Sequence, residues 1–255
     1  MQKTVFVCLI LWTLTACVTS PTGRSQLLLV DDGQMASMGE RVFDELKEKS
    51  PPLQDSKANA RVCCIVRALT QELQGEMRED WDVRLFNDKT PNAFALPGKK
   101  IGVNIGMLKL TENNDQLAAV IGHEIGHVLA RHGNERASLN LLAQLSEQVA
   151  GQAVDPSLAS VVGMGAKYGV LLPYSRSHET EADIIGQELM ARAGFNPQAS
   201  VAIWELLQQQ GGAKSPEFLS THPSDAARIQ LLGANLPQAD MLYQQAKFEG
   251  KKPSC

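Results

Sequence analysis

The sequence predicts a helix-rich α+β domain in which a small antiparallel sheet lies beside one central helix. Three observations predict this fold class. Apolar residues recur at helical spacings of three and four along most of the chain. Alternating apolar residues, which are typical of strands, occur only between residues 82 and 105. No repeat or interdomain linker divides the helical segments, so we expect them to share one core with the sheet.

The composition is that of an ordinary globular protein. The chain has 255 residues, of which 44% are hydrophobic and 20% are charged, and its formal net charge is -4. These values exclude an intrinsically disordered, a collagen-like or a polytopic membrane protein. The chain has no run of five basic residues, and its acidic balance gives little attraction to phosphate backbones. We therefore do not expect nucleic acid as a partner.

Residues 1–16 have the pattern of an export signal. Lys3 precedes an apolar run from Val5 to Leu14, which has the length of a signal peptide's apolar region and is too short to span a membrane. The tetrapeptide LTAC, which ends at Cys17, resembles a bacterial lipobox, whose cysteine is lipidated and becomes the new N-terminus. The alternative is a plain secretory signal that happens to end in Ala-Cys.

Lipidation at Cys17 implies a protein that is anchored to a membrane without a spanning helix. Val18 follows the cysteine in place of an aspartate, which by resemblance to the sorting rules of Gram-negative lipoproteins implies the periplasmic face of the outer membrane. We therefore expect a signal peptide over residues 1–16, a lipid-anchored tether over 17–33 and one domain over 34–255.

Three further cysteines, Cys63, Cys64 and Cys255, remain in the mature chain. Adjacent cysteines rarely bond to each other because the geometry is strained, so a disulfide from Cys63 or Cys64 to Cys255 is one prediction. Three unpaired thiols are the alternative.

The other elements follow from periodicity and from breakers such as Pro51 and Pro52. Helices are expected over 35–49 and 58–73, where apolar residues form one face. Strands are expected over 82–86, 93–96 and 101–105. The chain after Gly106 is predicted to be helical, with segments over 114–131, 135–153, 157–167, 178–193, 197–209, 224–233 and 239–248.

The segment HEIGH, from His123 to His127, is the sharpest chemical signal in the chain. Four residues along a helix turn about 400°, so His123 and His127 project from nearly the same face and can share one Zn²⁺. Glu124 lies about 100° around the helix, where its carboxylate can accept a proton from a water that the metal activates. We therefore predict one Zn²⁺ per chain, with Glu124 as the catalytic base. His132 is expected to point away from the metal as a polar cap.

A second acidic segment supplies candidate ligands. Glu179 and Asp183 are four residues apart at the start of a predicted helix, which Ser177 would cap. Glu179 can ligate the zinc, while Asp183 accepts the second ring N–H of a ligand histidine. Glu181 is the competing ligand.

These motifs resemble one class of zinc enzyme. Ala130 and Gly133 stand where a metzincin has glycine and a third histidine, which excludes that class. HEIGH followed by ETEAD at 179–183 resembles the HExxH…ExxxD signature of the gluzincin zinc metalloendopeptidases of the HtpX, BepA and LoiP group. NAFA at 92–95 and STHP at 220–223 resemble further elements of that group, so the likeness covers most of residues 35–235. A lipid-anchored, stand-alone peptidase domain is closest to the LoiP type.

The resemblance implies a zincin-like metallopeptidase domain that hydrolyses peptide bonds. It implies that substrate lies in extended form along the strand at Asn92, Ala93, Phe94 and Ala95, with unfolded or misfolded envelope proteins as partners. His222 would be a fourth zinc ligand or a gate, and the alternative is that it caps the following helix.

Two questions stay open at this point. Residues 134–176 are rich in small residues and would form either a mobile lid over the zinc or a packed helical hairpin. An envelope chaperone or outer-membrane assembly factor with a gated, weakly proteolytic zinc site is the rival function, and that role would not depend on Glu124.

Overall fold

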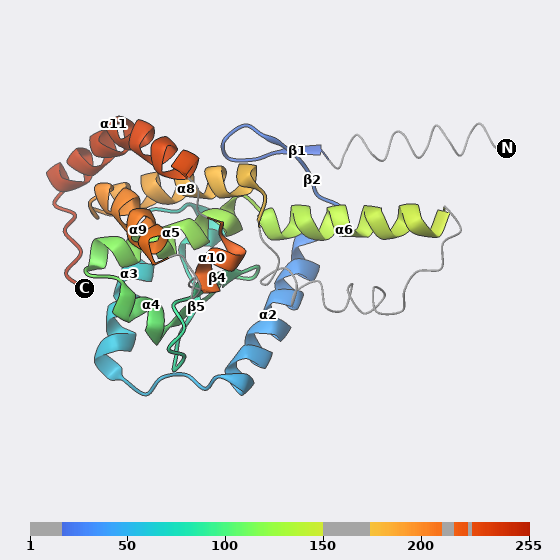
Figure 1. Ribbon diagram of the computed structural model, residues 1–255, viewed down its shortest axis with the longest axis horizontal. Helices are drawn as coiled ribbons and strands as arrows, with labels where there is room; N and C mark the ends of the chain where they lie inside the picture. The colour runs from blue at the N-terminus through green and yellow to red at the C-terminus, as the bar shows by residue number, and fades with distance from the viewer. Residues whose placement is uncertain (1–16, 150–173, 211–216, 224–225) are drawn as a thin grey trace.

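The computed structural model describes residues 17–149, 174–210, 217–223 and 226–255 (Figure 1). The strands are β1 (Cys17–Thr19), β2 (Ser25–Leu27), β3 (Asp82–Phe86), β4 (Ala93–Leu96) and β5 (Lys100–Asn104). The helices are α2 (Asp32–Lys49), α3 (Ser56–Thr70), α4 (Ile105–Leu110), α5 (Asn114–Leu129), α6 (His132–Val149), α8 (Arg176–Arg192), α9 (Gln198–Gln209), α10 (Glu217–Thr221) and α11 (Ala226–Phe248), with a 3-10 turn η1 at Gly75–Arg78. The predicted signal peptide, the helix predicted over 157–167 and most of the proposed lid lie outside the described residues. Of the helices described, none combines the length and apolar character that a membrane crossing requires.

The prediction of a helix-rich α+β domain is confirmed, but the helix boundaries near Pro237 are wrong. Two helices were expected over 224–233 and 239–248, whereas α11 runs through Pro237 without a break. An interior proline costs a helix roughly 3 kcal/mol. Leu232 and Ala239, on either side of it, are both buried, and α11 lies along α8 (Figure 1). Tertiary packing therefore outweighs the local preference.

The three-stranded sheet has the order β3-β5-β4, and the prediction of a wholly antiparallel sheet is wrong for one pair. β4 and β5 are antiparallel and join through a turn at Gly98, whose φ is 81°, but β3 and β5 are parallel. Alternation identifies strands and not their neighbours. The loop over 87–92 carries the chain past the position that β5 later fills. β4 is consequently an edge strand of this sheet.

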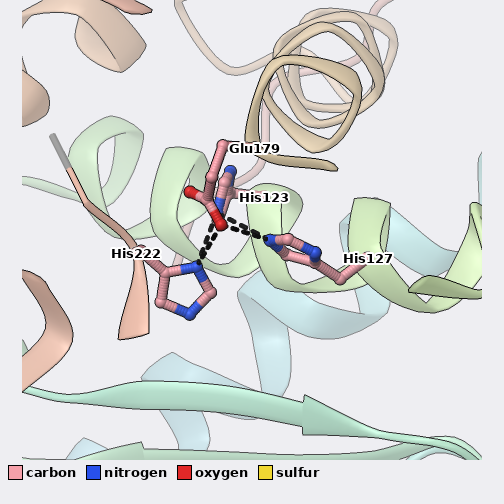
Figure 2. A group of neighbouring side chains, drawn as sticks. All are labelled: His123, His127, Glu179 and His222. Atoms are coloured by element: carbon pink, nitrogen blue, oxygen red, sulfur yellow. Dashed lines mark hydrogen bonds and ion pairs between the residues drawn. The ribbon is translucent and has the colours of Figure 1, made fainter. Parts of the chain in front are cut away.

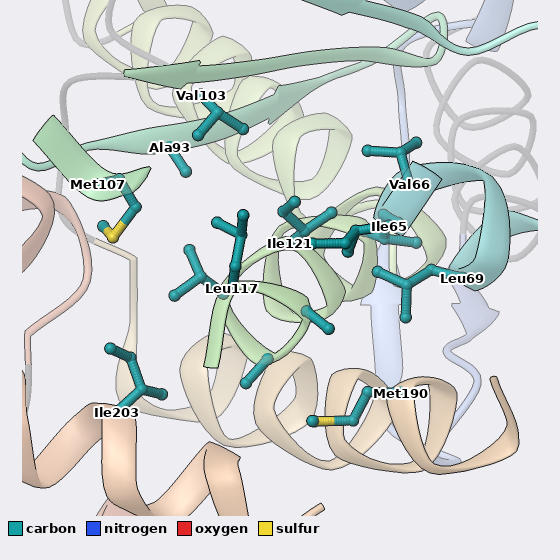
Figure 3. Close-up of a cluster of buried hydrophobic side chains, with 14 of the residues drawn as sticks. Ile65, Val66, Leu69, Ala93, Val103, Met107, Leu117, Ile121, Met190 and Ile203 are labelled. Atoms are coloured by element: carbon teal, nitrogen blue, oxygen red, sulfur yellow. The ribbon is translucent and has the colours of Figure 1, made fainter. Parts of the chain in front are cut away.

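Helix α5 is the centre of the fold. Its aliphatic face, which includes Leu117 and Ile121, packs against the sheet and α3 (Figure 3). Its other face contacts α8 at very short range, because a Cβ on Gly186 would lie 2.6 Å from the backbone nitrogen of His123. Only glycine permits this approach. The histidine-bearing helix is therefore buried between a sheet and a second helix.

A disulfide fixes the C-terminal end of the chain to helix α3. It joins Cys64 to Cys255, which confirms one of the predicted pairings, and Cys63 is free. The two bonded cysteines are 191 residues apart, and closing a loop of this size removes chain entropy from the unfolded state, a stabilisation of about 5 kcal/mol.

Residues 17–33, for which a tether is predicted, contain the antiparallel hairpin of β1 and β2. The hairpin lies beside α6 (Figure 1). Gln26 is buried, and its Nε2 donates to the Ala130 carbonyl at 2.6 Å. The backbone N–H of Leu29 donates to Ser138 Oγ at 2.7 Å. This segment is therefore attached to the domain at the junction of α5 and α6.

Candidate metal centre

Helix α5 places three of the predicted site residues in the interior. The side chain of Asn113 caps the helix by accepting from the backbone N–H of Gln116, and the helix continues unbroken to Leu129. His123, Glu124 and His127 are all at least 97% buried. Polar side chains are expensive to bury unless they meet partners, so their surroundings define what the site can bind.

Helix α8 brings the predicted acidic residues to the same place. It begins at Arg176, because Ser175 rather than the predicted Ser177 is the N-cap and accepts from the backbone N–H of His178 at 3.2 Å. Glu179 and Asp183, one turn apart, both face α5. Asp183 Oδ1 lies 2.9 Å from Nδ1 of His123, the contact that the four-residue spacing predicts.

His222 follows α10 and completes a cluster of four donor atoms, which we call the metal cluster: His123, His127, Glu179 and His222 (Figure 2). Nε2 of His123 lies 3.1 Å from both Nε2 of His127 and Nδ1 of His222. Oε1 of Glu179 lies 3.1 Å from Nδ1 of His222 and 3.4 Å from Nε2 of His127, and its Oε2 lies 3.5 Å from Nε2 of His123. A tetrahedral zinc site with bonds of about 2.0–2.1 Å has donors about 3.3 Å apart. The cluster therefore has the dimensions of one zinc coordination sphere.

The arrangement of the ring nitrogens in the cluster also favours a bound cation. Nδ1 of His123 lies 2.9 Å from the Asp183 carboxylate, which places the proton of a neutral ring on Nδ1 and leaves a lone pair on Nε2 toward the centre. His222 lies 3.3 Å from Glu124 through Nε2, so its inward Nδ1 does the same. Lone pairs and a carboxylate that face each other at this range repel one another. A metal ion relieves that repulsion, and imidazole with carboxylate is a donor set that suits zinc.

Arg228 on α11, which sequence analysis did not single out as a site residue, neutralises the carboxylates behind the cluster. Its Nε and Nη2 donate to Asp183 at 2.8 and 2.7 Å, and its Nη1 lies 2.6 Å from Glu179. The guanidinium also stacks over the Trp204 ring. Burial would raise the pKa of Asp183, but the charge of Arg228 outweighs this and lowers the pKa below its usual range. Asp183 therefore stays ionised as the acceptor for His123.

Glu124 lies between the metal cluster and strand β4. Its Oε2 accepts from the backbone N–H of Ala95 at 3.2 Å, which directs the carboxylate toward the edge of the sheet. Burial raises the pKa of Glu124 above its usual range, and the neighbouring charges of His222 and His123 only partly oppose this. A carboxylate of raised basicity that is held beside a metal site suits a general base.

His132 lies outside the metal cluster, as predicted, but the prediction that it is a polar cap is wrong. It is fully buried, and its Nδ1 lies 2.9 Å from Nδ1 of His127. The helical rotation assumed a continuous helix, whereas the chain turns at Arg131, whose φ is 55°, and α6 starts afresh at His132. Burial lowers the pKa of His132 to about 4, so the ring is neutral at pH 7. Glu181, the competing ligand, points away from the cluster and bonds to Nε2 of His132 at 3.1 Å.

Tyr174 covers the cluster on the side of strand β4. Its ring stacks on His127 with ring centres 3.9 Å apart, and its backbone N–H donates to the Thr221 carbonyl. Tyr174 borders a cavity of about 500 Å³ that also contacts His127 and Ala95. It also borders a hollow of about 10 Å³, which lies over Glu124 and is lined by the predicted substrate strand, Asn92, Ala93, Phe94 and Ala95.

This fold and site define a zinc metallopeptidase. A buried helix carries the HExxH motif, and a glutamate from a second helix adds a third ligand. The glutamate of the motif itself is a carboxylate base beside an edge strand. Residues 56–235 match the model of peptidase family M48. The chain belongs to peptidase family M48, and the His-His-Glu-His cluster is its zinc site.

Several characterised proteins are similar to this chain. The mitochondrial metalloendopeptidase OMA1 of Saccharomyces cerevisiae is 38% identical over 65% of this chain and 50% of its own length. OMA1 of Arabidopsis thaliana is 37% identical over 83% of this chain and 41% of its own length. The β-barrel assembly-enhancing protease of Escherichia coli (strain K12) is 28% identical over 77% of this chain and 42% of its own length. The chain thus spans about half the length, or less, of these relatives.

Proposed function

We propose that this protein is a zinc-dependent metalloendopeptidase that hydrolyses peptide bonds in unfolded or misfolded proteins of the cell envelope. The observation that carries the proposal is the position of Glu124, which lies between the metal cluster and an edge strand. A purely structural zinc site needs no carboxylate base at that position.

The chemistry divides between the metal and Glu124. Zinc held by His123, His127 and Glu179 supplies a Lewis acid that polarises a peptide carbonyl and makes water acidic. Glu124 accepts the proton of the attacking water and delivers it to the leaving amine. The Ala95 N–H holds Oε2 of Glu124, while Oε1 faces the metal cluster, 3.3 Å from Nε2 of His222, and is the oxygen that exchanges the proton.

Strand β4 supports a preference for extended substrates. It is an edge strand of its sheet, and its residues Ala93 to Ala95, together with the preceding Asn92, line the hollow that contains Glu124. A peptide that pairs with this edge presents its backbone to Glu124, and backbone pairing reads conformation more than sequence. Most strands of a folded protein are already paired within its own sheets, so unfolded segments are the substrates that we propose.

The proposed setting is the periplasmic face of the outer membrane, with an anchor on Cys17 as in the LoiP type. The support is the lipobox-like LTAC and the apolar run before it. The name of the Escherichia coli relative, a β-barrel assembly-enhancing protease, is consistent with an envelope setting.

The test uses the full-length protein in detergent and compares wild type with Glu124→Gln. Both are expected to bind about one zinc ion, while cleavage of unfolded casein falls at least about 100-fold in the variant. Glu188→Gln, which changes a carboxylate in a helical surface pair, is the matched control and should cleave normally. Equal cleavage by wild type and Glu124→Gln would exclude Glu124 as the base.

A gated site with a chaperone role is the second candidate, and the position of His222 favours it. Its Nδ1 fills the fourth corner of the cluster, whereas a catalytic zinc keeps one position open. The hollow beside Glu124 has room for about one water molecule, so a peptide enters only after His222 or Tyr174 moves. His222→Ala should then cleave casein faster than wild type. A chaperone role predicts instead that Glu124→Gln still prevents aggregation of unfolded outer-membrane proteins.

A further inference from the structure

A second buried polar cluster lies directly behind His127. We call it the outer network: Arg24, His132, Glu135, His178 and Glu181. Its members come from three separate segments, namely the β1–β2 hairpin, the start of α6 and the start of α8. Arg24 belongs to the hairpin and lies outside residues 56–235, the part that matches the family model.

Arg24 joins the two carboxylates of this network. Its Nη1 and Nη2 donate to the two oxygens of Glu135 at 2.8 and 2.6 Å, a bidentate pair. Its Nε donates to Glu181 Oε2 at 2.9 Å. Glu135 and Glu181 are both less than 10% exposed as residues. Without the guanidinium, the two carboxylates lose the cation that joins them and keep neutral donors such as His132, Thr22 and Gln26.

The network continues to the zinc ligand through His132. Because Nε2 of His127 faces the metal, its proton lies on Nδ1 and is donated to Nδ1 of His132 at 2.9 Å. His132 can accept there only if its own proton lies on Nε2. That proton is donated to Glu181 Oε2 at 3.1 Å. In this chain of hydrogen bonds from His127 through His132 to Glu181, each bond therefore fixes which atom donates in the next.

We propose that Arg24 is a positioning residue of the zinc centre, which holds His127 in its metal-binding tautomer through Glu181 and His132. Arg24 holds the Glu181 carboxylate in place, so that Glu181 accepts from Nε2 of His132. If Glu181 swings away, His132 can carry its proton on Nδ1 instead and donate it to His127. His127 then carries its own proton on Nε2, where it blocks the metal.

The proposal gives the N-terminal hairpin a defined part in metal binding. Thr22 Oγ1 also donates to Glu181, at 2.6 Å, so the hairpin contributes two donors to the same carboxylate. The hairpin begins at Cys17, the proposed point of lipid attachment. The expected effect on zinc affinity depends only on the outer network and the metal cluster. It does not require the envelope setting or any particular substrate.

The test measures the zinc affinity of the full-length protein in detergent by competition with a coloured chelator. Arg24→Ala is expected to weaken zinc binding by about tenfold and His132→Phe by about 10- to 100-fold, the range for outer partners of a metal ligand. Arg24→Lys keeps the charge but not the bidentate fork, so it should recover part of the loss. Arg192→Ala, which removes an exposed pair with Glu188, is the matched control.

A double mutant separates positioning from a general loss of stability. Because Arg24 acts on zinc only through His132, Arg24→Ala combined with His132→Phe should bind zinc within about twofold of His132→Phe alone. Thermal melts of the zinc-free variants show whether each is folded. Additive losses would overturn the proposal, as would an Arg24→Ala protein that is folded and binds zinc within about twofold of wild type.

Discussion

Two arginines stand behind the two ligand histidines of α5, at different depths. Arg228 is buried, with 5% of its side chain exposed, and bonds to Asp183, which contacts His123 directly. Arg24 is 26% exposed and reaches His127 only through two intervening side chains. Both arginines bridge two carboxylates. The difference lies in how much solvent each one keeps and in how many bonds separate it from the metal.

The same charge arrangement can therefore serve either the stability of the fold or the binding of zinc. A buried arginine is needed for folding, because water cannot replace it beside Asp183 and Glu179. A partly exposed arginine contributes less to stability, since water and salt can take over its role. We therefore expect changes at Arg228 to act on stability first, and changes at Arg24 to act mainly on zinc.

Replacing Arg228 should have the largest effect on stability. Arg228→Met leaves two buried carboxylates without a cation and should lower the free energy of unfolding by about 3–5 kcal/mol. Arg24→Met should cost about 1 kcal/mol or less, because its site is partly solvated. Urea unfolding of the zinc-free proteins gives both values. Equal losses would show that burial does not separate the two arginines.

The carboxylates bonded to the two arginines should also differ in how strongly their replacement weakens zinc binding, with Asp183 ahead of Glu181. Asp183→Asn removes the charge that contacts His123 directly, and zinc affinity should fall by about 10- to 100-fold. Glu181→Gln acts through His132 and keeps an acceptor oxygen, so its loss should be several-fold smaller. Competition with a chelator at pH 7 measures both. A larger loss in Glu181→Gln would reverse the comparison.

The part of the site that helical geometry predicted is the part whose residues are close in the chain, whereas His222 was predicted from the family resemblance alone. His123, Glu124 and His127 occupy one helix, where a fixed rotation of about 100° per residue decides their directions. Glu179 and Asp183 are similarly local to α8. The fold class followed from the same periodicities, which the buried faces of the helices bear out.

Residues brought together by tertiary structure could not be predicted in this way. The turn at Arg131 redirects His132 toward His127, and a prediction that assumes a continuous helix cannot anticipate such a break. Arg24 reaches the domain from a segment without periodicity, and β5 enters between β3 and β4 because of a loop path. A charged residue within an otherwise polar, small-residue segment was the one signal at Arg24, and it does not identify a partner.

The metal cluster and the outer network should respond to acid at different pH values. Zinc requires neutral histidines, whose ordinary pKa is about 6.5, so the metal should be released below about pH 6. Burial acts to raise the pKa of Glu181, but its hydrogen bonds, including that from Arg24, outweigh this and lower the pKa to about 2. The stability contributed by this carboxylate is therefore complete above the unfolded value of about 4.3, and it declines as pH falls from there toward 2.

The measurement compares wild type with Arg24→Ala across this range. The difference in their free energies of unfolding, measured on zinc-free protein, should stay constant from pH 7 to 5 and shrink below about pH 4. Zinc content of wild type, followed in parallel, should fall at higher pH. If both quantities changed at the same pH, near the ordinary pKa of histidine, protonation of the histidines rather than of Glu181 would control the outer network.

The smallest effect is expected at Thr22, which shares Glu181 with Arg24. Its hydroxyl donates to Oε1, while Arg24 and His132 bond to Oε2, so the carboxylate keeps two charged or polar partners when Thr22 is replaced. Thr22 is also exposed, which allows water to reach the oxygen that it leaves. Thr22→Val should therefore cost about 0.5–1 kcal/mol in urea unfolding and change zinc affinity less than twofold, roughly the limit of additivity errors. A tenfold loss of zinc affinity would show that the hairpin acts through Thr22 rather than through the charge of Arg24.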